Sequence, residues 1–405
     1  MISNRKTIGA VVRQLKVKNT ENEIGKDRLF GINIDKYFMP SVANIIGADL
    51  TKYKIVRREQ FAFNRMHVGR DGRLPIALSR STDAFLVSPA YTVFEIIDSS
   101  EILPEYLFMW FSRTEFDREA WFHTDADVRG GLPWDLFCAI ELPVPSIEKQ
   151  RAIVKEYQTV TDRIKLNEQL NQKLEETART IYKHWFVDFE FPNEDGLPYK
   201  SSGGEMVYND ELHQDLPVQF SITTLGLILE SHSEKHNFKK DKLIFFNTSD
   251  ILNGDFLHAD YREVSQLPGQ AKKSIKKHDI LFSEIRPVNK RFALVRVEAE
   301  DYVVSTKLMV LRVRNPMVNH LRMYQFLTRP KFINQLQRAA EGRSGTFPQI
   351  TFEEHLENYP FILGSKYIES KYEQILESYY HQLFARRDEN KVLKKVQGVL
   401  LAKMS

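Results

Sequence analysis

The sequence predicts an α+β protein in which two similar α/β domains are separated by an antiparallel two-helix coiled coil, with approximate two-fold symmetry. Three observations support this prediction. The 405-residue chain repeats itself at a spacing near 217 residues, and each copy ends in a long run with heptad spacing. The second run can pair with the first only by running back along it, because each run leaves one domain and leads toward the other.

Six segments recur in the same order and define the repeat. Residues 6–19 return at 223–236, with Gly9 matching Gly226, and residues 85–96 return at 302–313 with the alternation of branched and aromatic residues that strands favour. Four shorter matches join 57–63 to 276–282, 113–116 to 329–332, 127–134 to 341–350, and 141–150 to 358–371. Each copy is therefore expected to form a mixed domain of about 145 residues followed by a long helix.

These matches set the predicted boundaries. Two prolines before Ser146 stop the preceding strand, and Ser146 can cap the first long helix. The predicted parts are a first domain at 1–145, a central helix at 146–189, a linker at 190–217, a second domain at 218–364 and a C-terminal helix at 365–405.

Two heptad seams predict that the long helices pair with each other. The first seam runs from Ile153 to Trp185 and the second from Ile368 to Leu400, in steps of four and three residues. About 39 residues at about 1.5 Å each would make a stalk near 58 Å long, with one domain at each end. The alternative is that the two runs are unrelated amphipathic helices.

Both seams are polar in the middle. In-register antiparallel pairing would set Asn167 and Asn171 of the first helix against two polar residues of the second, Gln382 and Arg386. Polar seam residues reduce stability but select register and orientation.

Composition limits where the protein works. No apolar run approaches the roughly 18 residues of a membrane span, and the N-terminus lacks the apolar core and cleavage site of a secretory signal. We therefore expect a cytoplasmic protein without a membrane partner. Cys138 is the single cysteine, which excludes an internal disulfide framework and a multi-cysteine zinc site. No metal site is predicted.

Residues 141–217 resemble the central region of the DNA specificity subunits of type I restriction-modification systems. The similar stretches are "LPVPSIEKQRAIVKEY", the seam that ends in "TIYKHWFVDFEFP", and the following "GLPYKSSGGEMVYNDELHQDLP". The resemblance covers the whole chain in organisation and about 75 residues in detail. The C-terminal helix departs from this pattern because it ends without an aromatic stretch.

The resemblance implies a non-catalytic DNA-reading subunit of the prokaryotic cytoplasm, with two target-recognition domains. Such a subunit recognises a bipartite, asymmetric target in double-stranded DNA. It recruits two methyltransferase subunits and, in the full complex, two restriction subunits that move on DNA. No cofactor is then expected in this chain, because S-adenosylmethionine, ATP and magnesium belong to the partner subunits.

The aromatic stretch at the end of the central helix is a candidate partner surface. Tyr182, Phe186 and Phe189 fall off the seam, so they cannot all face the second helix. Large aromatic residues are favoured anchors of protein interfaces. We therefore predict that Tyr182, Trp185, Phe186 and Phe189 contact a methyltransferase subunit. The alternative is internal packing where the helix meets the second domain.

Polar and basic residues gather at matching positions of the two copies, near residues 64–73 and 283–291. Proteins read guanine with Arg or Lys and adenine with Asn or Gln, while other contacts to the phosphates set the register. Solvation of a charged surface is the alternative for any one of these residues. The predicted DNA contacts are Asn64, Arg65, Arg70, Arg73, Arg80 and Arg129 in the first copy, and Ser283, Arg286, Asn289, Lys290, Arg291 and Arg343 in the second.

No motif predicts an enzyme. The sequence lacks the phosphate-binding Gly-x-x-x-x-Gly-Lys-Ser/Thr loop and the zinc-binding His-Glu-x-x-His pattern. "RNPMVN" at 314–319 lacks the second proline and the ring with which amino-methyltransferases stack on a flipped base. Two other functions remain open: a coiled-coil adaptor that does not recognise DNA sequence, and a specificity subunit that serves a methyltransferase without a restriction partner.

Overall fold

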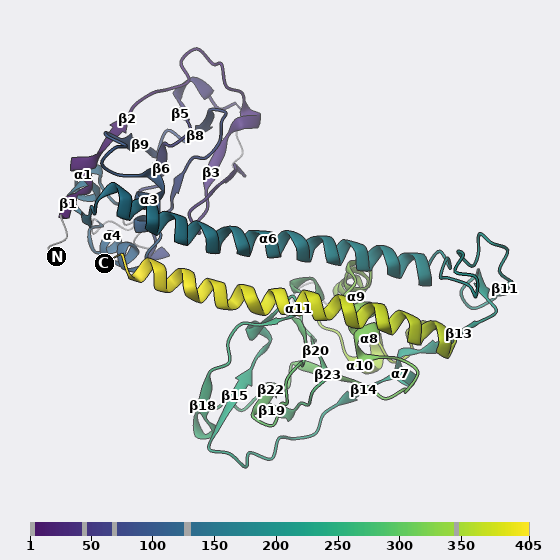
Figure 1. The fold of residues 1–405 in the computed structure, drawn as a ribbon. Helices are drawn as coiled ribbons and strands as arrows, with labels where there is room; N and C mark the ends of the chain where they lie inside the picture. The colour runs from purple at the N-terminus through teal and green to yellow at the C-terminus, as the bar shows by residue number, and fades with distance from the viewer. Residues whose placement is uncertain (1–4, 43–46, 67–70, 125–130, 344–347, 405) are drawn as a thin grey trace. The chain divides into compact units, whose positions relative to one another are not determined.

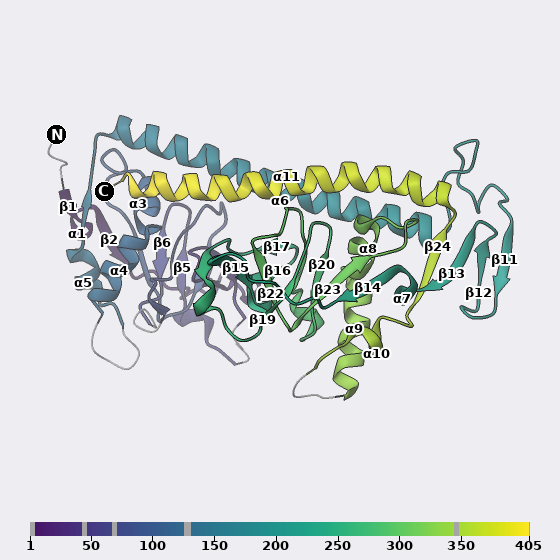
Figure 2. The ribbon, with the colours of Figure 1, turned by 90° about the horizontal axis from the view of Figure 1, so that it is seen from below.

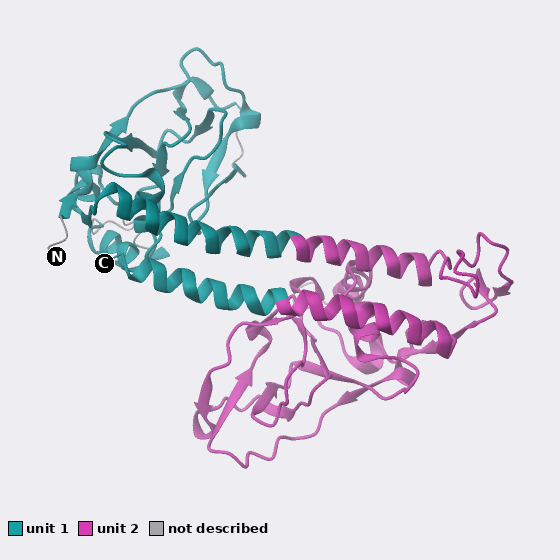
Figure 3. Cartoon of the chain, viewed as in Figure 1, with its two compact units in different colours: residues 1–169, 386–405 teal, residues 170–385 magenta. Residues whose placement is uncertain are grey.

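The computed structural model describes residues 5–42, 47–66, 71–124, 131–343 and 348–404. It divides into two compact units, which are unit 1 (Met1–Gln169 and Arg386–Ser405) and unit 2 (Leu170–Ala385) (Figure 3). The long helices α6 (Ile147–Phe186) and α11 (Lys366–Ala402) each contribute one part to unit 1 and one to unit 2.

Unit 1 is built around a four-stranded antiparallel sheet with the strand order β2-β9-β6-β7 (Figure 1). The four strands are β2 (Val12–Leu15), β9 (Thr92–Ile96), β6 (Phe61–Phe63) and β7 (Ile76–Leu78). Aromatic rings from the sheet and from the helices form its core, and Phe61 stacks on Phe94 with centroids 5.0 Å apart. The helices are α1 (Ile8–Val11), α3 (Pro104–Phe111), α4 (Thr114–Phe122) and α5 (Trp134–Ala139).

Smaller strand pairs complete unit 1. One pair joins the first strand to the strand before α6, and the other two cover the far side of the main sheet. They are β1 (Arg5–Thr7) with β10 (Glu141–Pro143), β3 (Phe30–Ile32) with β4 (Phe38–Pro40), and β5 (Lys54–Val56) with β8 (Phe85–Val87). Short 3-10 turns occur at Lys26–Arg28 and Leu50–Lys52.

Unit 2 repeats this plan. Its main sheet has the order β14-β23-β20-β21, formed by β14 (Leu229–His232), β23 (Leu308–Val313), β20 (Ile280–Ser283) and β21 (Phe292–Leu294). A second sheet has the order β18-β15-β22-β19, formed by β18 (Tyr261–Glu263), β15 (Lys242–Phe246), β22 (Tyr302–Ser305) and β19 (Ala271–Ser274). The helices are α7 (Leu225–Ile228), α8 (His320–Leu327), α9 (Pro330–Arg343) and α10 (Phe352–His355).

The remaining strands of unit 2 form three antiparallel pairs: β13 (Phe220–Thr224) with β24 (Pro360–Gly364), β16 (Ile251–Leu252) with β17 (Asp255–Phe256), and β11 (Met206–Asn209) with β12 (Gln214–Pro217). Short 3-10 turns occur at Thr248–Asp250, Val264–Gln266 and Pro287–Asn289, the last named η5.

The two units share strand register as well as topology. Val12 lies opposite Ile96 in unit 1, and Leu229 lies opposite Val313 in unit 2, each residue shifted by 217. A one-residue slip would turn every side chain of a strand to the other face, so a shared register preserves the same inward positions in both cores. The predicted α+β fold with two similar domains is confirmed.

The matched glycines of the repeat are explained by packing. A β-carbon at Gly9 would lie 2.9 Å from Cys138 Cβ, and one at Gly226 would lie 2.9 Å from the carbonyl oxygen of Glu357. Both distances are too short for a real side chain, so α1 and α7 each approach a neighbouring segment at a point where only glycine fits.

The long helices pair antiparallel within each unit, as predicted. In unit 1, Gln397 Nε2 donates to Thr161 Oγ1 at 2.8 Å, and Asn167 Nδ2 donates to Asn390 Oδ1 at 2.9 Å. In unit 2, the Trp185 and Tyr372 rings lie 5.3 Å apart. Residue numbers therefore rise along one helix as they fall along the other.

The predicted partners of the central asparagines are wrong for Asn167. It bonds to Glu389 Oε2 at 2.8 Å and to Asn390, one helical turn beyond Arg386. Asn171 is buried, and its Oδ1 has no hydrogen-bond partner among the described residues. The register differs because α11 does not follow one seam. Ile368 and Tyr372 are buried as predicted, but after Tyr372 the buried residues lie one position past the predicted ones, at Leu376, Tyr380 and Leu383, where they join the domain core.

Within the described ranges, no helix combines the length and the apolar character needed to cross a membrane.

Candidate nucleic-acid interface and partner groove

The β6–β7 hairpin of unit 1 carries the first predicted DNA loop. Asn64 is the first residue of the loop. Its backbone nitrogen donates to the Pro75 carbonyl at 2.9 Å, and this bond joins the two ends of the loop. Arg65 and Arg73 are exposed, and Arg73 Nη1 lies 3.4 Å from a carboxylate oxygen of Asp35. The structure therefore brings Asn64, Arg65 and Arg73 onto one hairpin.

Arg80 does not belong to this loop. Its guanidinium lies over the Phe108 ring, 5.1 Å from the centroid, and 3.7 Å from Glu105 Oε1. Both of these residues are on α3, so Arg80 packs against a helix. Arg70 and Arg129 lie outside the described residues, as does the side chain of Arg343.

A buried carboxylate fixes the β6–β7 loop from below. Asp117 of α4 is 7% exposed, and its Oδ1 accepts hydrogen bonds from Leu74 N at 3.1 Å and from Lys36 Nζ at 2.8 Å. Burial lowers the pKa of Lys36, whose ammonium also donates to the Phe111 carbonyl. Because Lys36 lies in the turn between β3 and β4, one carboxylate holds that turn and the β6–β7 loop together.

The β20–β21 hairpin of unit 2 occupies the corresponding place. Arg286 and Lys290 flank η5 with φ of 46° and 53°, the left-handed region that non-glycine residues seldom adopt. Arg286, Asn289 and Lys290 are all exposed. Gln337 of α9 accepts a hydrogen bond from Val288 N at 3.3 Å, so a buried polar side chain again holds the loop.

Two predicted DNA contacts of unit 2 have structural tasks instead. Ser283 is 2% exposed, and its hydroxyl accepts from Ile285 N at 3.0 Å and donates to Ile285 O at 3.2 Å. Arg291 Nη1 donates to the carbonyls of Ser249 and Ile251 at 2.9 and 3.0 Å. The burial of Ser283 and the two carbonyls bound by Arg291 therefore do not favour a base contact for either residue.

The aromatic stretch at the end of α6 is buried inside unit 2. Its four predicted partner residues are between 2% and 9% exposed and belong to the core of the domain: Tyr182, Trp185, Phe186 and Phe189. Internal packing, the alternative stated for these rings, accounts for most of their surface.

The rings enclose an arginine that the sequence analysis did not single out. Arg322 of α8 is 1% exposed, and its guanidinium carbon lies 3.7 Å from the Phe186 centroid and 4.9 Å from that of Tyr182. Cation–π contacts of this kind are strongest when solvent is excluded. Glu369 lies 3.5 Å away, and burial raises the pKa of its carboxyl group.

At the equivalent positions, unit 1 has two neutral residues. Tyr106 stands where unit 2 has Arg322, and its hydroxyl donates to the Pro143 carbonyl at 3.0 Å. Gln150 stands where unit 2 has Glu369, and its amide bonds to backbone groups that include Leu103 N at 2.9 Å. Unit 2 thus combines the buried charge with the aromatic stretch of α6. In unit 1 the equivalent site is uncharged, and α11 ends there without an aromatic stretch.

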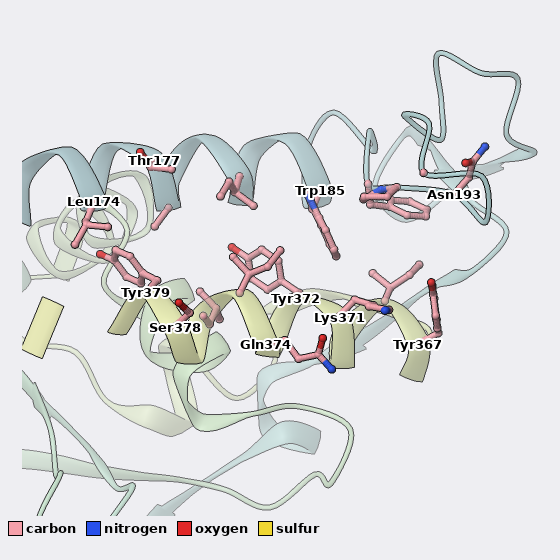
Figure 4. Close-up of a pocket in the computed structure, with 18 of the residues that line it drawn as sticks. Leu174, Thr177, Trp185, Asn193, Tyr367, Lys371, Tyr372, Gln374, Ser378 and Tyr379 are labelled. Carbon is pink, nitrogen blue, oxygen red and sulfur yellow. The ribbon is translucent and has the colours of Figure 1, made fainter. Parts of the chain in front are cut away.

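A mostly apolar groove of about 780 Å³ lies between α6 and α11 within unit 2 (Figure 4). Of the four predicted partner residues, only Trp185 lines it. Figure 4 shows Trp185 pointing from α6 toward α11, where Tyr372 and Lys371 lie. Tyr367, 56% exposed, lines the groove near the start of α11.

Among the described residues, no group of three His, Cys, Asp or Glu side chains is placed to hold a metal ion.

The architecture consists of two copies of one α+β domain with paired long helices. No protein-family model matches the chain. The type I restriction enzyme HindI specificity subunit of Haemophilus influenzae is 44% identical over 131 residues, which are 32% of this chain and 28% of that subunit. The corresponding MjaIX subunit of Methanocaldococcus jannaschii is 23% identical over 321 residues, 76% of this chain and 70% of that subunit.

The whole fold also has a solved counterpart. The S subunit of a type I restriction-modification system from M. genitalium matches with a TM-score of 0.58 and 13% identity, over 100% of this chain and 97% of that one. The fold is that of a type I S subunit. The resemblance to specificity subunits of type I restriction-modification systems is therefore confirmed, although the HindI match spans less than a third of that relative.

Proposed function

We propose that the chain is the non-catalytic DNA specificity subunit of a type I restriction-modification complex and that it recognises a bipartite, asymmetric target. The observation that carries this proposal is the duplication. The main sheets of both units have the same strand order and register, yet the corresponding hairpin loops carry different exposed side chains. Two copies of one scaffold with unlike loops suit a target composed of two unlike half-sites.

The exposed side chains of the loops have the chemistry that DNA requires. Arg65 and Arg73 in unit 1, and Arg286 and Lys290 in unit 2, can neutralise phosphates or donate to guanine. Asn289 presents an amide, the group that pairs with the major-groove edge of adenine. The unread gap between the half-sites would follow the length of the paired helices.

The groove of unit 2 is the proposed docking place for a methyltransferase subunit. Its apolar lining and exposed aromatic residue, Tyr367, match the enrichment of large rings at protein interfaces. Trp185 takes part directly, whereas Tyr182, Phe186 and Phe189 support the groove wall from the core. Two methyltransferase subunits and two restriction subunits complete the proposed complex, and S-adenosylmethionine, ATP and magnesium reside on those partners.

Methylated adenines in the DNA of cells that carry the complex test this proposal. A split motif of two unlike half-sites at a fixed gap, absent when the chain is deleted, is the expected result. Methylation without such a motif, together with a purified complex that selects no sequence from random duplexes, would favour the adaptor function instead. The same motif without ATP-dependent cleavage would indicate a system that lacks a restriction partner.

A further inference from the structure

A hairpin turn lies beside the candidate DNA loop of unit 2. The turn joins β16 to β17, and Asn253 N donates to the Lys290 carbonyl at 2.7 Å. Gly254 N donates to the Phe292 carbonyl at 2.9 Å. Figure 2 shows β16 and β17 next to β20, whose hairpin partner β21 follows the loop. The turn and the loop therefore form one continuous piece of surface.

The same two segments meet in unit 1. The turn between β3 and β4 contains Asp35, which lies 3.4 Å from Arg73 of the β6–β7 loop. Lys36 of the turn and the backbone of Leu74 share the buried Asp117 carboxylate. These bonds hold the turn and the loop at a fixed distance from each other.

Strand pairing identifies the two turns as equivalent. In unit 1, Leu29 makes a parallel bridge to Leu86 immediately before β3. In unit 2, Phe245 pairs in parallel with Val303, the residue that corresponds to Leu86, before the β16–β17 hairpin. Because both hairpins follow the same pairing step, the contact between turn and loop belongs to the shared scaffold.

The two turns differ in what they expose. The unit 1 turn exposes Ile34, Asp35 and Tyr37, and the unit 2 turn exposes Leu252 and Asn253. Base edges in the major groove are read by amides at adenine, by carboxylates at cytosine and by apolar groups at the thymine methyl. Different side chains from these classes, at one position of a common scaffold, are what two unlike half-sites need.

We propose that the turns at 33–37 and 252–255 complete the DNA-reading surface of each unit, and that Asn253 contacts a base in the half-site that unit 2 reads. This inference rests on the proposed function and deepens it, since it adds a second reading segment to each domain. The left-handed backbone of Asn253, with φ of 47°, fixes the position of the residue in the tight turn, a conformation that asparagine tolerates better than most residues.

Asn253→Gly tests the proposal, because glycine adopts the same backbone conformation without strain and removes only the side chain. The matched control is Asn22→Gly, an exposed turn asparagine of unit 1 with φ of 52°. Each variant is assembled with its methyltransferase. Methylated adenines are mapped, and binding is measured by competition on duplexes changed at one position at a time.

The expected result is loss of discrimination at one or two adjacent positions of one half-site, by about tenfold or more at each. The other half-site keeps its discrimination, the control keeps both, and Asn253→Gly still folds. Wild-type discrimination in Asn253→Gly, or an equal loss in both half-sites, would overturn the inference while the proposed function stands. A wild-type complex without a split motif would overturn both.

Discussion

The guanidinium of Arg322 lies 3.5 Å from the carboxylate of Glu369, and the two residues are only 1% and 4% exposed. None of the three guanidinium nitrogens has a hydrogen-bond partner among the described residues. The positive charge is therefore stabilised by one carboxylate and by aromatic rings at the end of α6, on β24 and on α11. Helix α6 is thus tied to α8 and to the start of α11 at a single buried charge.

Glu369→Gln should destabilise unit 2 strongly, because it leaves the arginine buried without its counter-charge. Breaking a buried ion pair in this way costs about 3–5 kcal/mol. Arg322→Met combined with Glu369→Gln should recover much of that loss. Urea unfolding of all four proteins in the cycle measures the coupling, and additive losses would show that the two residues act independently.

Replacement of both Asn167 and Asn390 by leucine should raise the stability of unit 1 and relax the helix register. Buried polar seam residues reduce stability while they select one alignment. Asn167→Leu alone should lower stability by about 1–3 kcal/mol, since it leaves the side-chain oxygen of Asn390 without its hydrogen-bond donor. Thermal unfolding gives the first result, and crosslinking between engineered cysteines on α6 and α11 reports the register. A single crosslinked register in the double variant would contradict the second expectation.

Acidification should destabilise unit 2 through His320. The His320 ring stacks on His278 with centroids 3.9 Å apart, and burial, followed by the neighbouring histidine, lowers its pKa to about 4. The unfolded chain then binds more protons than the folded one between about pH 4 and 6.5, so stability falls as the pH falls through this window. The contribution is up to about 1.4 kcal/mol per pH unit. His320→Phe should remove it, whereas the same change at the exposed His381 should not.

Arg65→Gln and Lys290→Gln should each weaken DNA binding and flatten its dependence on salt. A side chain that neutralises one phosphate contributes about 0.9 to the slope of log affinity against log salt. Lys173→Gln, an exposed change on α6, is the control. Fluorescence anisotropy of the assembled complex on its target duplex at several salt concentrations provides the slopes. A loss of affinity without a change of slope would instead indicate a base contact.

Changes on the rim of the unit 2 groove and in the core behind it should separate assembly from folding. Tyr367→Ser and Lys371→Glu alter exposed residues, so they should reduce co-purification of the methyltransferase at least severalfold while the melting temperature of the subunit stays the same. Phe186→Ala removes a ring that is 2% exposed, and it should cost about 3–5 kcal/mol of stability. Normal co-purification of the two rim variants would exclude the groove as the docking place.

The repeat and the long helices were predictable because they follow from local pattern. Alternation of apolar residues marks strands such as β8 and β9, and the heptad spacing marks α6. Helix register was harder. The sequence of α11 carries two adjacent apolar rows, one through Tyr379 and one through Tyr380, and only packing against the domain core decides which is buried deeper.

The residues of the candidate site likewise differ in how far the sequence alone could place them. Asn64, Arg65 and Asn289 could be placed on loops because turn-forming residues surround them. The bonds of Arg291 depend on neighbours that are close in space and distant in sequence, such as Ser249. Ser283 bonds to Ile285, two residues away, but its burial depends on the packing of the whole domain. Arg322 gave no signal in its own segment, since an arginine in a helix usually faces solvent. Its correspondence to Tyr106 in the other copy is the one clue that the repeat offered.

Gly9 and Gly226 are equivalent positions at which both copies require glycine. The copies have exchanged tyrosine for arginine and glutamine for glutamate at equivalent buried places, yet both keep glycine where a single methyl group would collide with the next segment. At these two positions, steric clearance therefore limits both copies to glycine. The two halves therefore share glycine at the equivalent positions where packing leaves no space for a side chain.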